Sequence, residues 1–461
     1  MSTISPQCSI ITFGCQMNKS DSERLATTLE NLGYQVKDSH EELKNEQADL
    51  VIFNTCSVRQ HAEDRVFGML KQLGRLKSQR PELLIAITGC MTRVSSTQKS
   101  QNRDQLLKQL KEVDFVFRIE DLGKISHLIK EVQPDFSTKE MEEAELNNYF
   151  AINPRYTNKF QAFVPIMTGC DKFCTYCIVP FTRGREVSRD LNEIYLEVVS
   201  LVEQGCIEVT LLGQNVNSYG LSWSDKRSGN FNYDTPPFVQ LLKKLDQIPG
   251  LKRLRFTSPH PQDMTDDVIT TIAEARTMMP YIHLPVQAGN NEVLRRMNRN
   301  YTREDYLKII AEIKRQIPDC ALSTDIIVGF PGETDEQFED TYSLFEEVEF
   351  DMSFTARFSP RRGTAAEKLM TDDVSPEEKA RRWHKLNDLL KVVSQKKHAQ
   401  FMGQTLEVLV ETYDEKTGLC TGRTPHFKKT EFPGNAELVG KLIDVKITET
   451  LTFLLKGEVA N

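Results

Sequence analysis

The chain has 461 residues, which is enough for two or three domains of ordinary size. Its 39% hydrophobic and 27% charged residues are typical of a globular protein, and no apolar run approaches the ~18 residues that span a bilayer. The formal net charge of −8 argues against non-specific coating of nucleic acid, although a local basic patch remains compatible with it. Because MSTISPQCSI lacks the features of a signal peptide, we expect a cytoplasmic protein whose ten cysteines stay reduced.

Residues 6–131 alternate short β-branched apolar runs with amphipathic helical patterns. The helical pattern SDSERLATTLENLG is expected to begin at a polar cap, Ser20 or Asp21, and to end at Gly33. This order predicts an α/β unit with a doubly wound, flavodoxin-like parallel sheet. The expected strands are CSIITFGC, ADLVIFNTC, PELLIAITGC and DFVFRI. The acidic stretch STKEMEEAELNNYFAINPRYTN then reads as an interdomain linker.

Residues 152–392 repeat the alternation with a longer period, and helical patterns such as DLNEIYLEVVSLVEQ separate six expected strands. Six βα units predict a partial (β/α)6 barrel, whose chemistry should lie at the carboxyl ends of the strands. The expected strands are FVPIMTGC, IEVTLLGQN, LKRLRFTS, YIHLPVQAG, ALSTDIIVGF and DMSFTARFSP.

Residues 400–461 follow a basic helical stretch and contain only short strands and turns, such as TLEVLVETYD and GLCTGRT. This pattern predicts a small carboxyl-terminal β-barrel.

Three cysteines, Cys170, Cys174 and Cys177, fall within GCDKFCTYC, and Cys170 closes the first expected barrel strand. Thiolates at this spacing can bind three irons of a 4Fe-4S cluster from one loop and leave the fourth iron open. An electron-transfer cluster would instead close all four positions with cysteine. The alternative is a structural zinc with a remote fourth ligand, although the paired C-x2-C elements typical of such sites do not accompany the loop.

Three further cysteines, Cys15, Cys56 and Cys90, each end an expected strand of the first sheet, in IITFGC, VIFNTC and IAITGC. The carboxyl ends of parallel strands form one rim where ligands bind, so these thiols are expected to converge on a joint site. The alternative is that each is an ordinary buried cysteine. That second interpretation is the one we adopt for the four remaining cysteines, Cys8, Cys206, Cys320 and Cys420.

Six motifs together resemble the methylthiotransferases, a family of radical S-adenosylmethionine (SAM) enzymes. They are TFGCQMNKSDSERL, NTCSVRQHAEDRV, TGCMTR, GCDKFCTYCIVPFTRGREVSR, LLGQNVNSYG and STDIIVGFPGETDEQF. The resemblance covers nearly the whole chain in the family's order of an amino-terminal domain, a radical SAM core and a TRAM barrel.

The resemblance implies two 4Fe-4S clusters and SAM as cofactors. One cluster, on Cys170, Cys174 and Cys177, would chelate SAM and cleave it to a 5′-deoxyadenosyl radical. The other would carry sulfur, methylated by another SAM, to C2 of an adenine; its ligands would be Cys15, Cys56 and Cys90. Since that carbon has no acidic proton or leaving group, radical chemistry from a cofactor is the available route. A flavodoxin or ferredoxin is implied as the electron donor.

Further residues near the cofactors are expected from the resemblance and from the ends of the strands. Tyr176 matches the family's aromatic residue that contacts the adenine of SAM. Glycines at strand ends allow a nucleoside to approach the backbone, although plain turn chemistry also explains them. The arginines after the cluster loop are expected to contact the carboxylate of SAM or RNA phosphate, with solvated surface arginines as the alternative. These strand-end and loop candidates are Gly213, Asn215, Gly329, Glu333, Arg183, Arg185 and Arg189.

The loop GRTPHFKK of the terminal barrel gathers Arg423, His426, Lys428 and Lys429 within seven residues, and we expect it to grip RNA phosphate. The motifs GCQMN and GRTPHFKKTEFPG favour the branch of the family that acts on isopentenylated adenosine beside the anticodon. The resemblance thus implies the tRNA anticodon stem-loop as partner, and we expect the protein to be a monomer. The branches that modify threonylcarbamoyladenosine or a ribosomal protein are alternatives. A non-catalytic Fe-S protein that binds RNA is an alternative from another class.

Overall fold

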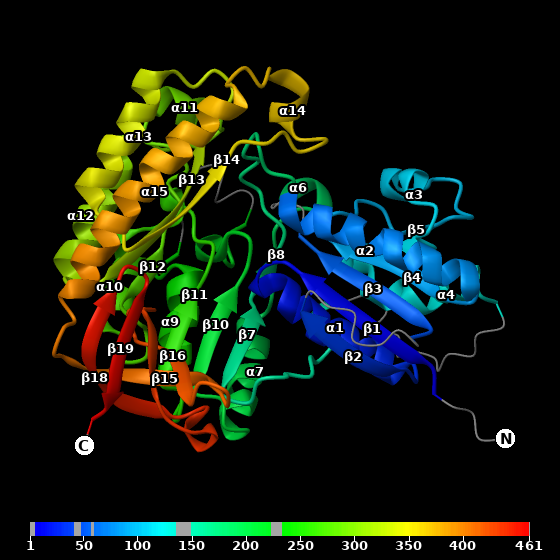
Figure 1. The fold of residues 1–461 in the computed structure, drawn as a ribbon, viewed down its shortest axis with the longest axis horizontal. Helices are drawn as coiled ribbons and strands as arrows, with labels where there is room; N and C mark the ends of the chain where they lie inside the picture. The colour runs from blue at the N-terminus through cyan, green and yellow to red at the C-terminus, as the bar shows by residue number, and fades with distance from the viewer. Residues whose placement is uncertain (1–4, 41–47, 57–59, 135–148, 223–232, 461) are drawn as a thin grey trace.

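The structure is a computed structural model that describes residues 5–40, 48–56, 60–134, 149–222 and 233–460. Figure 1 shows an amino-terminal unit beside a central core, with a small barrel at the carboxyl end packed on the side of the core away from the amino-terminal unit. Most of the expected interdomain linker lies outside the described residues.

A six-stranded sheet with helices on both faces forms the amino-terminal unit. Its elements are β1 (Gln7–Phe13), α1 (Gln16–Asn31), β2 (Gln35–His40), β3 (Leu50–Thr55), α2 (Gln60–Gln79), β4 (Leu84–Gly89), β5 (Ser96–Thr97), α3 (Gln105–Gln109), β6 (Phe115–Val116), the 3-10 helix η1 (Ile119–Lys124) and α4 (Ile125–Val132). The strand order is β2-β1-β3-β4-β6-β5, parallel except for the edge strand β5. Alternate strand residues enter two hydrophobic cores, one against α1 and α4 and one against α2 and α3. The predicted doubly wound sheet is therefore confirmed.

The first helix begins earlier than its sequence pattern predicts. The prediction of a start at Ser20 or Asp21 is wrong, because the backbone N–H of Cys15 donates to Asn18 Oδ1 at 3.3 Å and α1 starts at Gln16. Ser20 and Asp21 are buried within the helix and make contacts to the core unit. The predicted end at Gly33 is confirmed, since Gly33 follows the helix with φ +99°.

Six parallel strands form the core unit, as the sequence predicts. Its elements are η2 (Tyr149–Ala151), β7 (Gln161–Pro165), β8 (Met167–Thr168), α6 (Val179–Thr182), β9 (Val187–Ser188), α7 (Leu191–Glu203), β10 (Glu208–Leu212), η3 (Val216–Ser218), α9 (Pro237–Asp246), β11 (Arg253–Phe256), η4 (Pro261–Asp263), α10 (Asp266–Glu274), β12 (Tyr281–His283), α11 (Asn291–Arg296), α12 (Arg303–Gln316), β13 (Ala321–Val328), α13 (Asp335–Val348), β14 (Met352–Arg357), α14 (Ala365–Leu369) and α15 (Pro376–Ala399). The sheets β7-β10-β11 and β12-β13-β14 are joined by a parallel bridge between Leu254 and Met278. This open barrel confirms the predicted partial (β/α)6 architecture.

One detail of the first barrel strand differs from the prediction. The strand β7 ends at Pro165, and the next residues form β8, which pairs antiparallel with β9. Cys170 therefore lies in the loop after β8 and does not close the strand itself. The short β8–β9 pair turns the chain so that the cysteine loop starts beyond the barrel edge.

A closed five-stranded barrel in the order β15-β16-β17-β19-β18 forms the carboxyl-terminal unit and confirms the prediction for this region. Its elements are β15 (Thr405–Asp414), β16 (Leu419–Arg423), β17 (Lys429–Pro433), η5 (Ala436–Leu438), β18 (Leu442–Leu451) and β19 (Leu454–Val459). The long helix α15 leads into this barrel and contacts it through Ser394, which donates to the carbonyl of Thr452, and through His398, 2.7 Å from the carbonyl of Leu451. In the described part of the chain, no helix is both long and apolar enough to cross a membrane.

Candidate active site

Three cysteines of the amino-terminal sheet lie at one rim because their strands end in register. Phe13 of β1 pairs with Thr55 of β3, which pairs with Gly89 of β4. Cys56 and Cys90 follow these positions directly, and each donates its backbone N–H to the neighbouring strand at 2.8 Å. Cys15 lies two residues beyond Phe13, at the start of α1. Neighbouring parallel strands lie about 4.8 Å apart, so the three thiols come close together without any proximity in sequence.

The thiols of this rim influence one another. A hydrogen bond from Cys56, with help from the guanidinium of Arg183, lowers the pKa of Cys90 to about 6 against the effect of burial. Desolvation and the charge of Cys90 raise the pKa of Cys15, although Cys15 keeps an exposed edge. A thiolate is the metal-binding form of cysteine, and among these thiols the neighbours of Cys90 favour its thiolate.

A buried amide network holds the rim in place. Asn18 accepts from the Cys15 backbone and donates through Nδ2 to Asn54 Oδ1 at 2.9 Å. Asn54 in turn donates to Ser22 Oγ at 2.9 Å and to the carbonyl of Asn18 at 2.8 Å. Both asparagines are fully buried, and their hydrogen bonds fix the start of α1 against β3. The sequence analysis missed this role, although both residues lie in motifs that it singled out, GCQMN and IFNTC.

The second set of cysteines lies in a loop whose first turn depends on glycine. Gly169 has φ +80°, and a Cβ at this position would lie 2.1 Å from the carbonyl oxygen of Arg185. Its N–H donates to Gln214 Oε1 at 2.6 Å, and Cys170 donates to the carbonyl of Gly184 at 3.2 Å. The loop is thus closed on the segment that follows it, which brings the three cysteines back over the mouth of the barrel.

The far side of this loop rests on the chain after α11. The backbone N–H of Thr175 donates to the carbonyl of Met297 at 3.0 Å, and the Asn298 amide donates to the carbonyls of Lys172 and Phe173 at 3.1 and 3.0 Å. Phe173 has φ +50° and turns the chain between the first two cysteines. Backbone and side-chain hydrogen bonds therefore fix the geometry of this loop.

One cysteine of each set interacts electrostatically with the other set, across the boundary between the amino-terminal unit and the core. Burial and the neighbouring Cys174 raise the pKa of Cys177 to about 12, and the charge of Cys90 contributes to this shift. In the described ranges, no three His, Cys, Asp or Glu side chains gather as the ligands of a single metal ion would. Each cysteine ligand of a 4Fe-4S cubane binds a different iron, so cysteines that hold such a cluster need not gather around a single point.

Sequence reasoning missed a buried arginine, Arg299, beside the loop that carries Cys170, Cys174 and Cys177 (the cluster loop). Arg299 is 8% exposed, and its Nε has no hydrogen-bond partner among the described residues. Although burial opposes its charge, the phenols of Tyr176 and Tyr301 and the thiols of Cys174 and Cys177 raise the pKa of Arg299. A permanently charged group with a spare donor at this position suits an anionic ligand. The sequence carries no local signal for it, since MNRNY reads as an ordinary helix end.

The predicted cofactor-contacting residues take different positions. Tyr176 lies edge-on to Phe330, with ring centroids 6.5 Å apart, next to the cluster cysteines. Arg185 is exposed, bonds to Asp171 and lies over the Phe173 ring at 5.6 Å. Both side chains border the cluster loop.

The strand-end candidates Gly213, Asn215, Gly329 and Glu333 are buried, and they contact neighbouring turns and helices. A Cβ on Gly213 would lie 2.6 Å from Met167 Cγ, and Asn215 donates to Ser218 Oγ and Asp263 Oδ2. In the GFPGE turn, Gly329 has φ +69° and donates to Glu333 Oε2 at 2.6 Å.

Glu333 and two arginines of the cluster segment also form buried ion pairs. Glu333 pairs with Arg382 of α15 at 2.8 Å, so its carboxylate fixes the turn. Arg189 pairs with Glu197 at 2.6 Å, and Arg183 pairs with Asp21 of α1. Of the three arginines, only Arg185 therefore keeps the exposed position that contact with a phosphate requires.

The basic loop of the terminal barrel faces the core. Arg253 of β11 donates to the carbonyl of Arg423 at 2.9 Å, and Arg255 donates to those of Thr424 and Pro425 at 3.2 and 3.0 Å. The ring of Phe427 stacks on Tyr281 at 4.7 Å.

Its four predicted RNA-binding side chains are differently exposed. Lys428 is 6% exposed and pairs with Asp351. Arg423 stacks over Phe427 at 4.2 Å, and His426 is half-buried against Phe401. Of the four, only Lys429 is exposed. The sequence predicts that this loop grips RNA phosphate, whereas in the structure most of the loop docks the barrel onto the core.

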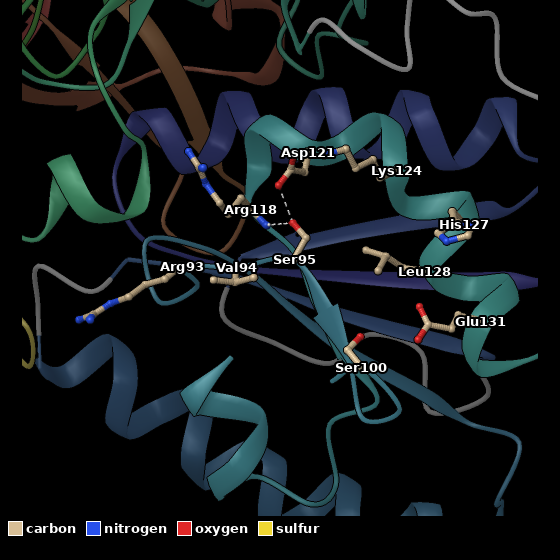
Figure 2. Close-up of a pocket in the computed structure, with 10 residues that line it drawn as sticks. All are labelled: Arg93, Val94, Ser95, Ser100, Arg118, Asp121, Lys124, His127, Leu128 and Glu131. Carbon is tan, nitrogen blue, oxygen red and sulfur yellow. Dashed lines mark hydrogen bonds and ion pairs between the residues drawn. The ribbon is translucent and has the colours of Figure 1, made fainter. Parts of the chain in front are cut away.

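A separate pocket of about 490 Å³ lies in the amino-terminal unit, between the chain after Cys90 and the helices η1 and α4 (Figure 2). Ser95 accepts from the backbone N–H of Arg118 at 3.0 Å and donates to Asp121 at 2.7 Å. Its charged lining consists of Arg93, Arg118, Lys124, His127, Asp121 and Glu131. Cations and carboxylates both face this pocket, so its charge does not single out one class of ligand.

Comparison with known proteins agrees with this architecture. Residues 164–345 match the radical SAM superfamily, residues 399–460 match the TRAM domain, and residues 7–118 match a family described as "Uncharacterized protein family UPF0004". The fold resembles the radical SAM methyltransferase TsrM from Kitasatospora setae, with a TM-score of 0.54 and 12% identity over 78% of this chain and 74% of that one. It also resembles the cobalamin-dependent radical enzyme OxsB, with a TM-score of 0.51 and 11% identity over 85% and 56% of the two chains. The chain is thus a radical SAM protein with a TRAM barrel.

Sequence relatives narrow this class to one family. Proteins named tRNA-2-methylthio-N(6)-dimethylallyladenosine synthase are 43% identical in Geobacillus kaustophilus, over 98% of this chain and 82% of the relative. Those of Acetivibrio thermocellus and Clostridium tetani are 42% and 43% identical, each over 97% of this chain and over 90% and 95% of the relative. The chain belongs to the tRNA-2-methylthio-N(6)-dimethylallyladenosine synthase family of methylthiotransferases. The resemblance stated from the motifs is thereby confirmed.

Proposed function

We propose that this chain methylthiolates a tRNA adenosine, replacing C2–H of N6-(dimethylallyl)adenosine with C2–SCH3 in a radical SAM reaction. The name of the full-length relatives supports the substrate and the product. The observation that supports the proposal is the electrostatic link between the two sets of cysteines, since Cys90 acts on both Cys15 and Cys177. The reaction needs a radical source and a sulfur source beside the same carbon, and this arrangement supplies sites for both.

The donor sets fit the cofactors that the reaction requires. Cys170, Cys174 and Cys177 would hold the radical SAM 4Fe-4S cluster, and the rim of Cys15, Cys56 and Cys90 would hold an auxiliary 4Fe-4S cluster. When bound and supplied with a low-potential electron, the first cluster provides reductive cleavage of SAM, and the auxiliary cluster provides the sulfur.

The side chains of this protein prepare the site for SAM. The buried guanidinium of Arg299, with its unpartnered Nε, is placed to bind the carboxylate of SAM beside Cys174 and Cys177. The ring of Tyr176, held edge-on by Phe330, supplies an apolar surface for the adenine.

Two partners follow from the reaction. A flavodoxin or ferredoxin would supply the electron, and the tRNA anticodon stem-loop would bring the adenosine to the mouth of the barrel. The exposed Lys429 and Arg185 are the candidates of the predicted basic set that remain accessible to RNA phosphate.

Mass spectrometry of tRNA nucleosides from a deletion strain tests the proposal. The 2-methylthio derivative of dimethylallyladenosine should disappear, and the unmodified precursor should accumulate. A second experiment separates the two cysteine sets: Cys15→Ala should still release 5′-deoxyadenosine from SAM under anaerobic reducing conditions but should not form the methylthiolated product. Unchanged product in the deletion strain would remove the assignment, and normal product with Cys15→Ala would remove the auxiliary cluster.

A further inference from the structure

A buried ion pair between Asp21 and Arg183 joins the amino-terminal unit to the core. One N–H group of this arginine has no acceptor among the described residues. Asp21 of α1 is fully buried, and it pairs with Arg183, whose side chain is 2% exposed. The Tyr149 hydroxyl donates to the other oxygen of Asp21 at 2.6 Å. Nη1 of Arg183 is buried and has no hydrogen-bond partner among the described residues. A buried guanidinium N–H without an acceptor is costly, so this geometry calls for an acceptor beside it.

The groups that interact electrostatically with Arg183 are Asp21, Cys90 and Glu120. The guanidinium of Arg183 acts on the thiols of Cys90 and Cys15, both on the rim of the amino-terminal sheet. Arg183 itself belongs to the core, directly after α6, where its backbone N–H donates to the carbonyl of Val179 at 2.8 Å. Arg118 of the amino-terminal unit holds this segment from the other side by donating to the carbonyl of Thr182 at 3.2 Å. A side chain of the core thus reaches across the boundary to the cysteines of the neighbouring unit.

The positive charge of Arg183 is opposite in sign to the cluster that the rim of Cys15, Cys56 and Cys90 would hold. Three thiolates with a 4Fe-4S cluster carry a net negative charge, which increases when the cluster is reduced. A buried negative charge is stabilised by a nearby cation and by N–H donors. Of the other charged groups around Arg183, Asp21 is its partner, and Glu120 lies between the cations of Arg118 and Arg183. Arg183 is therefore a buried cation whose charge acts on Cys90 and Cys15 of the rim.

We propose that Arg183 is a positioning residue for the auxiliary cluster: its Nη1–H donates to a sulfur at Cys90, and its charge, oriented by Asp21, favours the reduced cluster. This inference rests on the proposed function, which assigns the auxiliary cluster to Cys15, Cys56 and Cys90. Arg183 then acts on the auxiliary cluster, and not on the carboxylate of SAM or on RNA phosphate as the sequence predicts.

The test uses the full chain with Cys170, Cys174 and Cys177 all changed to Ala, so that only the auxiliary cluster is present. Its reduction potential is measured by anaerobic titration followed by electron paramagnetic resonance. Arg183→Gln should shift the potential to a more negative value, and Arg183→Lys should recover most of the shift because it keeps the charge. Asp21→Asn should shift the potential in the opposite direction, because it removes a negative charge from the same pair.

The matched control is Arg185→Gln, an exposed arginine two residues away, which should leave the potential unchanged. An unchanged potential with Arg183→Gln would overturn the inference. If Arg183→Gln does not retain iron, the Asp21→Asn variant provides the test. A reduction potential of Asp21→Asn that is not more positive than that of the parent would also overturn the inference. If the variant with Cys170, Cys174 and Cys177 changed to Ala binds no cluster, the auxiliary site of the proposed function is refuted. This outcome differs from a bound cluster whose potential does not respond to Arg183→Gln, which refutes only the role of Arg183.

Discussion

One buried carboxylate, Asp351, contributes to the docking of the terminal barrel onto the core. Asp351 lies directly before β14 and pairs with Lys428 of the barrel and with Lys397 of α15, the latter at 2.9 Å. It also accepts the backbone N–H of Leu322 at 3.0 Å. Asp351 and Lys428 are 8% and 6% exposed, so both charges depend on their partners and not on water.

The two partners should not be equally sensitive to substitution. Asp351→Asn leaves the ammonium of Lys428 buried without a countercharge, and breaking a buried pair in this way costs about 3–5 kcal/mol. Lys428→Met leaves Asp351 with Lys397 and the N–H of Leu322, and the methionine fills a similar volume. We expect this change to cost about 1–2 kcal/mol. The double variant should cost less than the sum of the single variants, because the two groups interact directly.

Urea unfolding of the full chain, with hydrogen exchange of the amides of residues 424–428, measures this difference. Lys429→Met is the matched control, since Lys429 is the exposed neighbour and its removal should cost less than about 0.5 kcal/mol. The lysines hold the pKa of Asp351 below its ordinary value, so the docking should persist at neutral pH and weaken only as the pH falls through that lowered pKa. A cost for Lys428→Met equal to or above that for Asp351→Asn would refute this reasoning.

Three further predictions concern the site itself. Gly169→Ala introduces a Cβ that would lie 2.1 Å from the carbonyl of Arg185, so the cluster loop should not close. Iron should then fall from about eight to about four per chain, whereas Gly68→Ala, where a Cβ meets open space, should leave it unchanged. Arg299→Met should weaken SAM binding by about 10- to 100-fold, as loss of a charged hydrogen bond does, in anaerobic calorimetry; a similar loss with the exposed Arg295→Met would contradict the role of Arg299. Burial raises the pKa of Glu120 to about 7, so the folded chain binds a proton that the unfolded chain releases, and this group lowers stability as the pH rises from about 4.5 to 7. Glu120→Gln should therefore gain on the order of 2–3 kcal/mol in urea unfolding at pH 8 relative to pH 5, and an equal gain at both pH values would count against it.

Much of the fold is readable from local patterns in the sequence. The strands β1, β3 and β4 of the amino-terminal sheet are largely apolar runs, since both faces of this sheet are covered by helices. Strand β2 was not predicted, because its residues QVKDSH are mostly polar and it lies at the sheet edge, where one side needs no partner strand. The start of α1 was predicted too late, because Ser20 and Asp21 resemble helix caps but serve contacts with the core.

Some residues of the candidate site can also be recognised from the sequence, and others cannot. The spacing of Cys170, Cys174 and Cys177 is local and can be read directly, and the strand-end positions of Cys15, Cys56 and Cys90 follow from the topology of a parallel sheet. Arg299 and Arg183 could not be assigned from the sequence, because a buried arginine looks like any other until its neighbours are known. The same limit applies to Lys428, which the sequence places in a basic loop and the structure places in a buried ion pair.

The sequence by itself indicated most of the elements and the candidate ligands, because hydrophobic period and cysteine spacing are properties of neighbouring residues. Tertiary structure alone decided which charges meet. Asp21 and Arg183 are 162 residues apart, and Asp351 and Lys428 are 77 residues apart, yet each pair shares a buried contact. The energy of such a contact depends on distance and on the exclusion of water, and folding sets both only when separate units close on one another.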